Sequence, residues 1–336
     1  MMSRIRTAII GMGKMGRLRA DVLKNHGGFE LVATCDIDGN WDYTDWRECV
    51  DKAKPEAVFI CAINSVMADA VTFALESGVH VFCEKPPGRN LFDTERMEGA
   101  YNKSSKVLKF GFNHRYHNSI IETKTLIDAN LLGNLVCVRG VYGKAGSVTF
   151  DKEWRNNPKL SGGGILLDQG IHMLDLMCYF MGDLSIQHSS VDRLVWDNLQ
   201  TEDSVFAVLR TDCGKIASLH SSAIQWKHKF DMDLIFTEGF VALNGLLTGS
   251  GSYGEERITY YRKELAPKDE RLGNPLEHTF CFDNDNSWDL EIEEFYNAVQ
   301  KGEQIVNGTI QDAKRAMRLV EGIYENNMNT TPTGGK

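Results

Sequence analysis

The sequence predicts two domains: an α/β domain with a doubly wound parallel sheet, then an α+β domain with a large, mostly antiparallel open sheet. Three observations support this. The length of 336 residues suits about two domains. Up to about residue 118, apolar runs alternate with helical stretches, and beyond residue 135 most strands follow one another and alternate apolar with polar side chains. We expect the domains over 1–118 and 119–326, with a flexible tail over 327–336.

In the first domain, each short apolar run suits a buried parallel strand and is followed by a helical stretch. The expected strands span 5–10, 29–35, 57–62, 78–82 and 107–112. The expected helices span 17–25, 44–48, 68–77 and 91–105.

The second domain is predicted to begin with a helix over 119–129. Its expected strands span 135–143, 186–196, 203–210, 215–223, 230–236 and 240–244. Amphipathic helices over 289–301 and 310–326 close the chain, and we expect them to pack on the first domain. An open sheet leaves one face exposed, and pairing two such faces buries it, so we expect a homodimer or homotetramer through this sheet.

Composition excludes several function classes. With 37 basic and 46 acidic residues the formal net charge is -9, and no Lys/Arg cluster is present to bind a nucleic acid backbone. The longest apolar run, 57–63, is too short to span a membrane, and the first residues do not resemble a signal peptide. The eight cysteines lack metal-binding or redox spacing. We expect a reduced, cytoplasmic protein with no metal, nucleic acid or membrane partner.

A glycine-rich turn follows the first expected strand and opens a helix. It has the sequence Gly11-Met12-Gly13-Lys14-Met15-Gly16, and Asp36 ends the next strand 20 residues later. Gly11 suits a tight turn, Gly13 a close approach of backbone to pyrophosphate, and Gly16 close packing of helix on strand. Asp36 would bind the adenosine ribose hydroxyls and repel a 2′-phosphate, which predicts NAD rather than NADP. The alternative is an ordinary turn with Asp36 as a strand-end cap.

Lys85 follows the strand over 78–82, at a Pro86-Pro87 turn that stops the strand. Ligands of open α/β sheets bind beyond the carboxyl ends of the strands, so Lys85 is predicted to meet a substrate, the alternative being a solvated loop lysine. Asn64 ends the preceding strand, near where the nicotinamide half should lie. The predicted cofactor contacts are Gly11, Met12, Gly13, Lys14, Met15, Gly16, Asp36, Asn64, Glu84 and Lys85.

Asp168, His172 and Asp175 have i, i+4 and i+7 spacing, which predicts one face of a helix. A histidine takes a proton near neutral pH, and a neighbouring carboxylate can orient it and stabilise its charged form. The alternative is a helix-capping aspartate beside a core histidine. A zinc site lacks a third ligand at convincing spacing.

Several motifs together resemble the glucose–fructose oxidoreductase / inositol dehydrogenase / rhizopine-catabolism (Gfo/Idh/MocA) family of NAD(P)-dependent oxidoreductases, over nearly the whole chain. They are Gly11–Gly16, Glu84-Lys85-Pro86, Gly111-Phe112-Asn113-His114-Arg115, Trp154-Arg155, and Gly162-Gly163-Gly164 through Asp168 and His172. The resemblance implies a Rossmann domain that binds NAD(P), a second domain that binds substrate, and a cis peptide bond at Lys85-Pro86, which proline makes accessible.

The resemblance also implies roles for the catalytic residues. Lys85 would hydrogen-bond the reacting hydroxyl and help to move its proton, Asp168 would bind or polarise the sugar, and His172 would act as general base on oxidation. The implied substrate contacts are Asn113, Arg115, Trp154 and Arg155, for which interdomain packing and surface ion pairs are the alternative. The chain departs from the family at Ile63 and Met67, where Pro and His are usual, so the loop around Asn64 differs.

Lys144, Lys152 and Arg155 lie in a region similar to the substrate loops of nucleotide-sugar 3-dehydrogenases, and they suit a phosphate or carboxylate. Our first expectation is therefore oxidation of a ring hydroxyl of a nucleotide-linked or otherwise anionic sugar in surface-polysaccharide biosynthesis. The alternative is a dehydrogenase of free sugars or polyols. Two further classes stay open: a regulator that senses NAD without catalysis, and a lyase or hydrolase that oxidises its substrate transiently.

Overall fold

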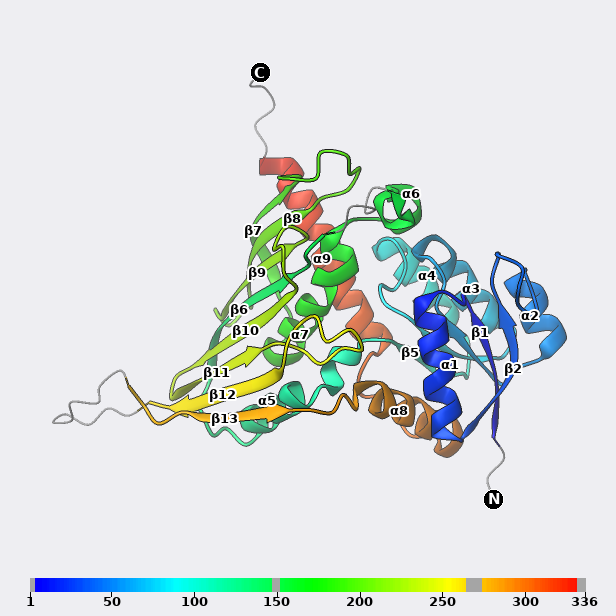
Figure 1. The fold of residues 1–336 in the computed structure, drawn as a ribbon, viewed down its shortest axis with the longest axis horizontal. Helices are drawn as coiled ribbons and strands as arrows, with labels where there is room; N and C mark the ends of the chain where they lie inside the picture. Colours follow the sequence, from blue (N-terminus) through cyan, green and yellow to red (C-terminus); the bar gives the residue numbers. More distant parts are fainter. Residues whose placement is uncertain (1–3, 147–151, 264–273, 331–336) are drawn as a thin grey trace. The chain divides into compact units, whose positions relative to one another are not determined.

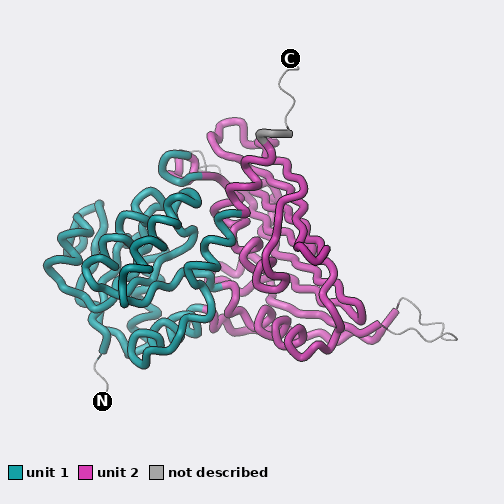
Figure 2. Tube along the Cα trace, turned by 180° about the vertical axis from the view of Figure 1, so that it is seen from behind, with its two compact units in different colours: residues 1–113, 157–162, 288–318 teal, residues 114–156, 163–287, 319–336 magenta. Residues whose placement is uncertain are grey.

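The computed structural model describes residues 4–146, 152–263 and 274–330. The chain forms two compact units, shown in different colours in Figure 2. Unit 1 comprises residues 1–113, 157–162 and 288–318, and unit 2 comprises 114–156, 163–287 and 319–336. The chain therefore leaves unit 1 after residue 113 and returns to it twice.

Unit 1 contains a five-stranded sheet in the order β2-β1-β3-β4-β5, in which every neighbouring pair is parallel. The strands are β1 (Ile5–Ile10), β2 (Phe29–Cys35), β3 (Ala57–Ile60), β4 (His80–Cys83) and β5 (Leu108–Phe110). The strands β3 and β5 are buried along their whole length, as a parallel sheet covered on both faces requires. The predicted α/β class of the first domain is confirmed.

Helices alternate with these strands (Figure 1). They are α1 (Lys14–His26), α2 (Trp46–Ala53), α3 (Asn64–Glu76) and α4 (Leu91–Tyr101), joined later by α6 (Pro158–Ser161), α8 (Ser287–Lys301) and the first part of α9 (Ile310–Thr330). The helix predicted over 44–48 begins at Trp46 instead, because the Asp45 side chain caps it by accepting from the amides of Arg47 and Glu48. α9 continues to Thr330, so part of the expected tail is helical, and the rest of that tail lies outside the described residues.

The strand order of unit 1 changes direction between β1 and β3, which creates a topological switch point at the carboxyl edge. The glycine turn leaves β1 there, and Asn64 begins α3 just after β3. Gly11 has a φ of 90°, and a Cβ at this position would lie 2.6 Å from the backbone of Ala62. Only glycine fits where the two connections pass so closely.

Helix α8 covers part of this sheet through aromatic packing. The Phe295 ring makes edge contacts with Phe59 and Phe82, with centroids 5.4 and 5.8 Å apart. Phe59 and Phe82 stack on one another at 4.8 Å. All three rings are fully buried, so a helix from the end of the chain completes the core of the first unit.

A buried ion-pair network ties α1 to β4 and α8. Arg19 of α1 is fully buried; its Nε donates to Glu84 and its Nη2 donates to Glu291, both at 2.6 Å. Burial raises the pKa of Glu291 to about 7, against the opposing positive charges of Arg19 and Lys109. Glu291 is therefore a buried group that titrates near neutral pH.

The described part of unit 2 holds an eight-stranded sheet in the order β13-β12-β11-β10-β6-β9-β8-β7, antiparallel except for the β6–β9 pair. The strands are β6 (Leu135–Gly143), β7 (Ser185–Asp192), β8 (Ser204–Arg210), β9 (Ile216–Ser222), β10 (Lys229–Phe236), β11 (Gly239–Asn244), β12 (Glu256–Arg262) and β13 (His278–Phe282). The predicted mostly antiparallel sheet is confirmed, although β12 and β13 were not among the predicted strands.

Helices α5 (Asn118–Asp128) and α7 (Ile171–Met181) cover one face of this sheet (Figure 1). α7 approaches β6 closely at Gly140, where a Cβ would lie 2.6 Å from the sulfur of Met173. A π-helical turn, Leu166–Gly170, leads into α7. The close approach fixes the position of this turn and helix on the sheet.

We predict that Glu291→Gln flattens the pH dependence of stability. The folded state raises the pKa of Glu291 from 4.5 to about 7, so its contribution to stability is full below pH 4.5 and is lost as the pH rises through 7. Across this window the wild type should lose about 1.4 kcal/mol more unfolding free energy per pH unit than the variant. Urea denaturation at several pH values measures this. Parallel curves for the two proteins would contradict the prediction.

Candidate functional site

The glycine turn of unit 1 fits a dinucleotide pyrophosphate. A Cβ on Gly16 would lie 1.9 Å from the carbonyl oxygen of Gly11, so this glycine lets α1 pack directly on the turn. A Cβ on Gly13 would have no heavy atom within 4 Å, so the backbone there is open to a ligand. Lys14 and Met15 form the first turn of α1, where backbone amides have no partner within the helix and attract an anion.

Asp36 lies beside this turn at the end of β2. One of its carboxylate oxygens accepts from the amide of Met12 at 2.6 Å, and the other accepts from the amide of Ile37 at 2.7 Å. The carboxylate is thus held against the turn, at the place where an adenosine ribose lies in dinucleotide-binding domains.

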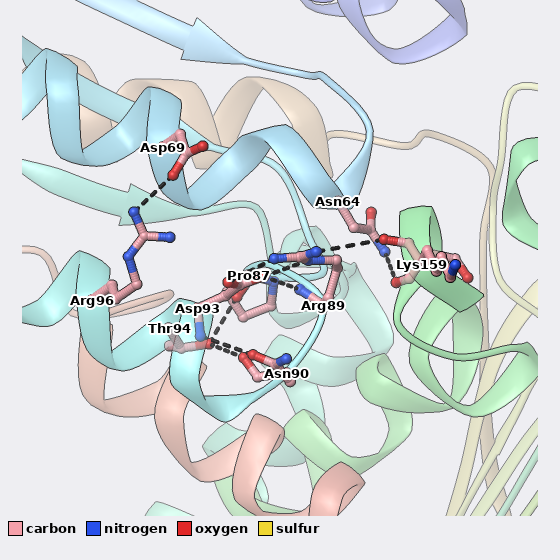
Figure 3. Close-up of polar contacts among 10 residues, drawn as sticks. Asn64, Asp69, Pro87, Arg89, Asn90, Asp93, Thr94, Arg96 and Lys159 are labelled. Atoms are coloured by element: carbon pink, nitrogen blue, oxygen red, sulfur yellow. Dashed lines mark hydrogen bonds and ion pairs between the residues drawn. The ribbon is translucent and has the colours of Figure 1, made fainter. Parts of the chain in front are cut away.

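Asn64 is buried, and its side chain has a partner inside unit 1. Its Nδ2 donates to the carbonyl oxygen of Ser161 in α6 at 2.7 Å (Figure 3). Arg89 donates to the carbonyl oxygen of Lys159 in the same helix. A Cβ on Gly162 would lie 2.2 Å from the carbonyl oxygen of Arg89, so α6 packs tightly on the loop before α4. The Asn64 amide therefore helps to hold α6 on unit 1.

Lys85 follows β4, and its peptide bond to Pro86 is cis, as the resemblance implied. The loop beyond it is fixed to α4 (Figure 3). Asp93 accepts from both the backbone amide and the Nε of Arg89, at 3.1 and 2.9 Å, and the hydroxyl of Thr94 donates to the carbonyl oxygen of Pro87 at 2.7 Å. The segment that carries Lys85 is therefore anchored on its carboxyl side.

In unit 2, the Asp168 carboxylate contacts two positively charged side chains. Its Oδ2 accepts from Lys144 Nζ at 2.8 Å, and its Oδ1 accepts from Arg155 Nε at 3.3 Å. Trp154 lies next to them, with the Arg155 guanidinium 4.6 Å from its ring centroid. Unit 2 therefore brings together Asp168 and two of the predicted substrate contacts.

The helix predicted to carry Asp168, His172 and Asp175 is not regular throughout. Asp168 lies in the π-helical turn, and the other two lie in α7. The wider turn inserts a residue into the helical repeat, which i, i+4 spacing cannot reveal. Such π turns are frequent at functional sites.

His172 is buried and lies flat against a second imidazole. The rings of His172 and His114 stack with centroids 3.8 Å apart and an angle of 15° between their planes. His114 Nε2 and the hydroxyl of Tyr142 are hydrogen-bonded at 2.9 Å. The stack fixes the plane of the His172 ring.

Arg115 and Asp175 form a buried bidentate pair, with N–O distances of 2.8 and 2.6 Å. The Arg115 guanidinium also lies over the Tyr179 ring, 4.7 Å from its centroid. These contacts hold Arg115 within unit 2. Asn113 is buried and ends unit 1, at the start of the short helix Asn113–Tyr116.

Sequence reasoning missed Glu202, which holds the start of the π-helical turn. Its carboxylate accepts from the amides of Gly164 and Leu166 and from the hydroxyl of Tyr324, at 2.8–3.1 Å. Burial raises the pKa of Glu202, against these hydrogen bonds. Because Glu202 lies 34 positions after Asp168 in a short polar stretch, nothing in the sequence pattern identifies it.

Comparisons with known proteins agree with this architecture. Residues 5–112 match the family model described as "Oxidoreductase family, NAD-binding Rossmann fold", and residues 120–242 match the GFO/IDH/MocA C-terminal domain. The chain is 30% identical to D-glucoside 3-dehydrogenase of Escherichia coli K12 over 254 residues, which cover 66% of this chain and 70% of that protein.

Inositol 2-dehydrogenase of Salmonella typhimurium is 27% identical over 194 residues, 53% of this chain and 55% of that protein, so the match spans about half of this relative. A solved structure of levoglucosan dehydrogenase in complex with NADH has the same fold, with a TM-score of 0.83, 17% identity, and coverage of 97% of this chain and 98% of that one.

The match to the oxidoreductase family model, over a Rossmann unit with an intact glycine turn, makes this chain an NAD-dependent oxidoreductase. The chain belongs to the Gfo/Idh/MocA family. Within the described residues, no helix is long and apolar enough to cross a membrane.

We predict that Asp36→Ser weakens NAD binding about tenfold or more and narrows the preference for NAD over NADP. The substitution removes charge-assisted hydrogen bonds to the ribose and the repulsion of a 2′-phosphate. Titration of both cofactors by calorimetry gives the two dissociation constants. Asp38→Ser, which removes a nearby exposed carboxylate, is the matched control. Unchanged constants for Asp36→Ser would contradict the assignment.

Proposed function

We propose that this protein oxidises a ring hydroxyl of a sugar or polyol and transfers the hydride to NAD. The observation that carries the proposal is that unit 2 holds a cation-bound Asp168 in the π-helical turn and a buried, stacked His172 in the helix that follows directly. The relatives support the substrate class, because D-glucoside 3-dehydrogenase and inositol 2-dehydrogenase are named for cyclic polyhydroxyl substrates.

Each side chain has a proposed task. When bound, NAD accepts the hydride. Lys85 donates a hydrogen bond to the reacting oxygen and helps to move its proton, and Asp168 binds a sugar hydroxyl. His172 accepts the hydroxyl proton, and its stacked ring is already oriented for the transfer.

A second candidate substrate class is an anionic sugar, nucleotide-linked or phosphorylated. Lys144 and Arg155 both contact Asp168, and Arg155 also contacts Glu153, so an anionic substrate would compete with these carboxylates for the two cations. Arginine in particular suits bidentate binding of phosphate. The relative named glucose-6-phosphate 3-dehydrogenase, from Bacillus subtilis, acts by its name on such a substrate and is 30% identical over 186 residues.

We predict that one substrate class in a panel of glucosides, inositols, sugar phosphates and nucleotide sugars supports NAD reduction. The absorbance of the reduced nicotinamide measures this. Lys85→Met and His172→Asn should each lower kcat about 100-fold or more, because each removes a group that moves the reacting proton. NAD binding by His172→Asn, measured separately, controls for folding. Full activity in either variant would contradict the proposed roles.

Lys144→Met separates the two substrate classes. For a neutral sugar the KM of this variant should change little. For an anionic sugar its KM should rise about tenfold or more, because a charge-assisted hydrogen bond is lost.

Two outcomes of the substrate panel would assign the protein to another functional class. Bound NAD with substrate cleaved and no net reduction would favour a lyase or hydrolase, and bound NAD with no chemistry would favour a regulator.

We also propose that the open face of the unit 2 sheet pairs with a second copy of the chain. Phe206, Val208 and Ile216 lie on neighbouring strands of this sheet, with 50%, 39% and 43% of their surfaces exposed. Phe206 of β8 stacks on His220 of the neighbouring strand β9, toward the β7 edge of the sheet. An apolar patch of this kind suits a self-complementary interface.

We predict that light scattering after size-exclusion chromatography gives the mass of a dimer or tetramer. Phe206→Glu should shift the protein toward the monomer, because it places charges opposite one another across a two-fold interface. Val306→Glu, at an exposed apolar position of unit 1, is the control. A monomeric wild type at micromolar concentration would overturn the proposal.

A further inference from the structure

Arg19 is a fully buried charge that the proposed reaction does not use. Its guanidinium lies between two aromatic rings, 4.4 Å from the Phe82 centroid and 4.7 Å from the Trp288 centroid. It binds Glu84 with Nε and Glu291 with Nη2, both at 2.6 Å. Arg19 therefore joins three elements of unit 1: α1, the end of β4 and α8.

Glu84, which directly precedes Lys85, is fixed from two sides. Its backbone amide donates to the carbonyl oxygen of Ile60 at 2.9 Å, which continues the sheet. Its carboxylate is bound by Arg19 and packs on Gly111, where a Cβ would lie 3.0 Å from Oε2 and 3.3 Å from Arg19 Nη2. Gly111 thus leaves room for the ion pair. Glu84, expected from the sequence among the cofactor contacts, has a buried carboxylate directed at Arg19.

Stability alone is a poor explanation for this network. Burying three charges is costly, and well-packed apolar side chains at such positions are often as stable or more stable. Moreover, Nη1 of Arg19 and Oε1 of Glu291 are buried and have no hydrogen-bond partner among the described residues, which adds a desolvation cost. What arginine offers is a rigid planar fork that binds two carboxylates at fixed angles, which neither lysine nor an apolar residue can do.

We propose that Arg19 is a positioning residue for Lys85: by clamping the Glu84 carboxylate, it sets the direction in which the Lys85 side chain leaves the end of β4. The inference rests on the proposed function, because Lys85 acts there on the reacting oxygen. α1 also begins at the glycine turn, so the same helix that faces the cofactor holds the lysine segment.

The test compares Arg19→Lys and Arg19→Met with Lys314→Met. Lys314 is another largely buried cation of unit 1, paired with Glu98 and remote in sequence from the Lys85 segment, so it controls for the loss of an ion pair. In Arg19→Lys the charge is kept but the fork is lost. This variant should lower kcat about 100-fold, as misplacing a catalytic group does, with an unchanged dissociation constant for NAD. Lys314→Met should keep the wild-type kcat.

A second measurement needs neither substrate nor turnover. Lysines are labelled by reductive methylation with ¹³C-formaldehyde, and the Lys85 resonance is assigned by its absence in Lys85→Arg. It should shift in Arg19→Lys and stay in place in Lys314→Met. This measurement decides the inference even if none of the sugars in the panel supports NAD reduction by the wild type, which would refute the proposed function.

Three results would overturn the inference. The first is an unmoved Lys85 resonance in Arg19→Lys. The second is an unchanged kcat with a lower melting temperature, which would make the network purely structural. The third is weaker NAD binding with unchanged kcat, which would assign Arg19 to the cofactor turn. Arg19→Lys supplies the answer if Arg19→Met does not fold.

Discussion

The arrangement of unit 1 depends on the buried guanidinium of Arg19. It can be buried only because Glu84 and Glu291 come to it from two other elements, and because Phe82 and Trp288 cover its faces. Those partners fix where α8 lies and where the end of β4 lies. The Arg19–Glu84 ion pair also explains the glycine at position 111, because a side chain there would displace the pair.

In unit 2, as in unit 1, polar side chains in the interior are held by contacts with side chains from other elements. A carboxylate and an imidazole lie in an otherwise apolar helix layer. Asp168 accepts hydrogen bonds from Lys144 and Arg155, and the His172 ring stacks on the His114 ring. Glu202 then satisfies the amides at the start of the π-helical turn. Asp168 and His172 are therefore held by neighbours from several elements: the residue after β6, the short helix Trp154–Asn156 and η1 (Asn113–Tyr116).

The sequence predicted what local patterns determine. The glycine turn, the strand ending at Lys85 and the alternating strands of unit 2 are all visible in short windows. Long-range pairings such as Arg19 with Glu84, or Glu202 with Gly164, join residues far apart in sequence and leave no periodic signal. The π-helical turn was not predicted for a related reason: the spacing of residues in the sequence indicates their positions around a helix only where the helix is regular. Strand β12 carries the buried Glu256, an acid that bonds His117 and obscures the strand pattern.

The division of the chain has a consequence for how the protein can be made and cut. Unit 1 is not a continuous stretch: its core needs Phe295 and its buried arginine needs Glu291, both from near the end of the chain. A fragment that stops at residue 118 would expose the Phe59 and Phe82 rings and leave Arg19 with only one carboxylate. On the ribosome, unit 1 cannot complete its core until residues 291–295 have emerged, after most of unit 2, so the two units cannot mature simply in order of synthesis.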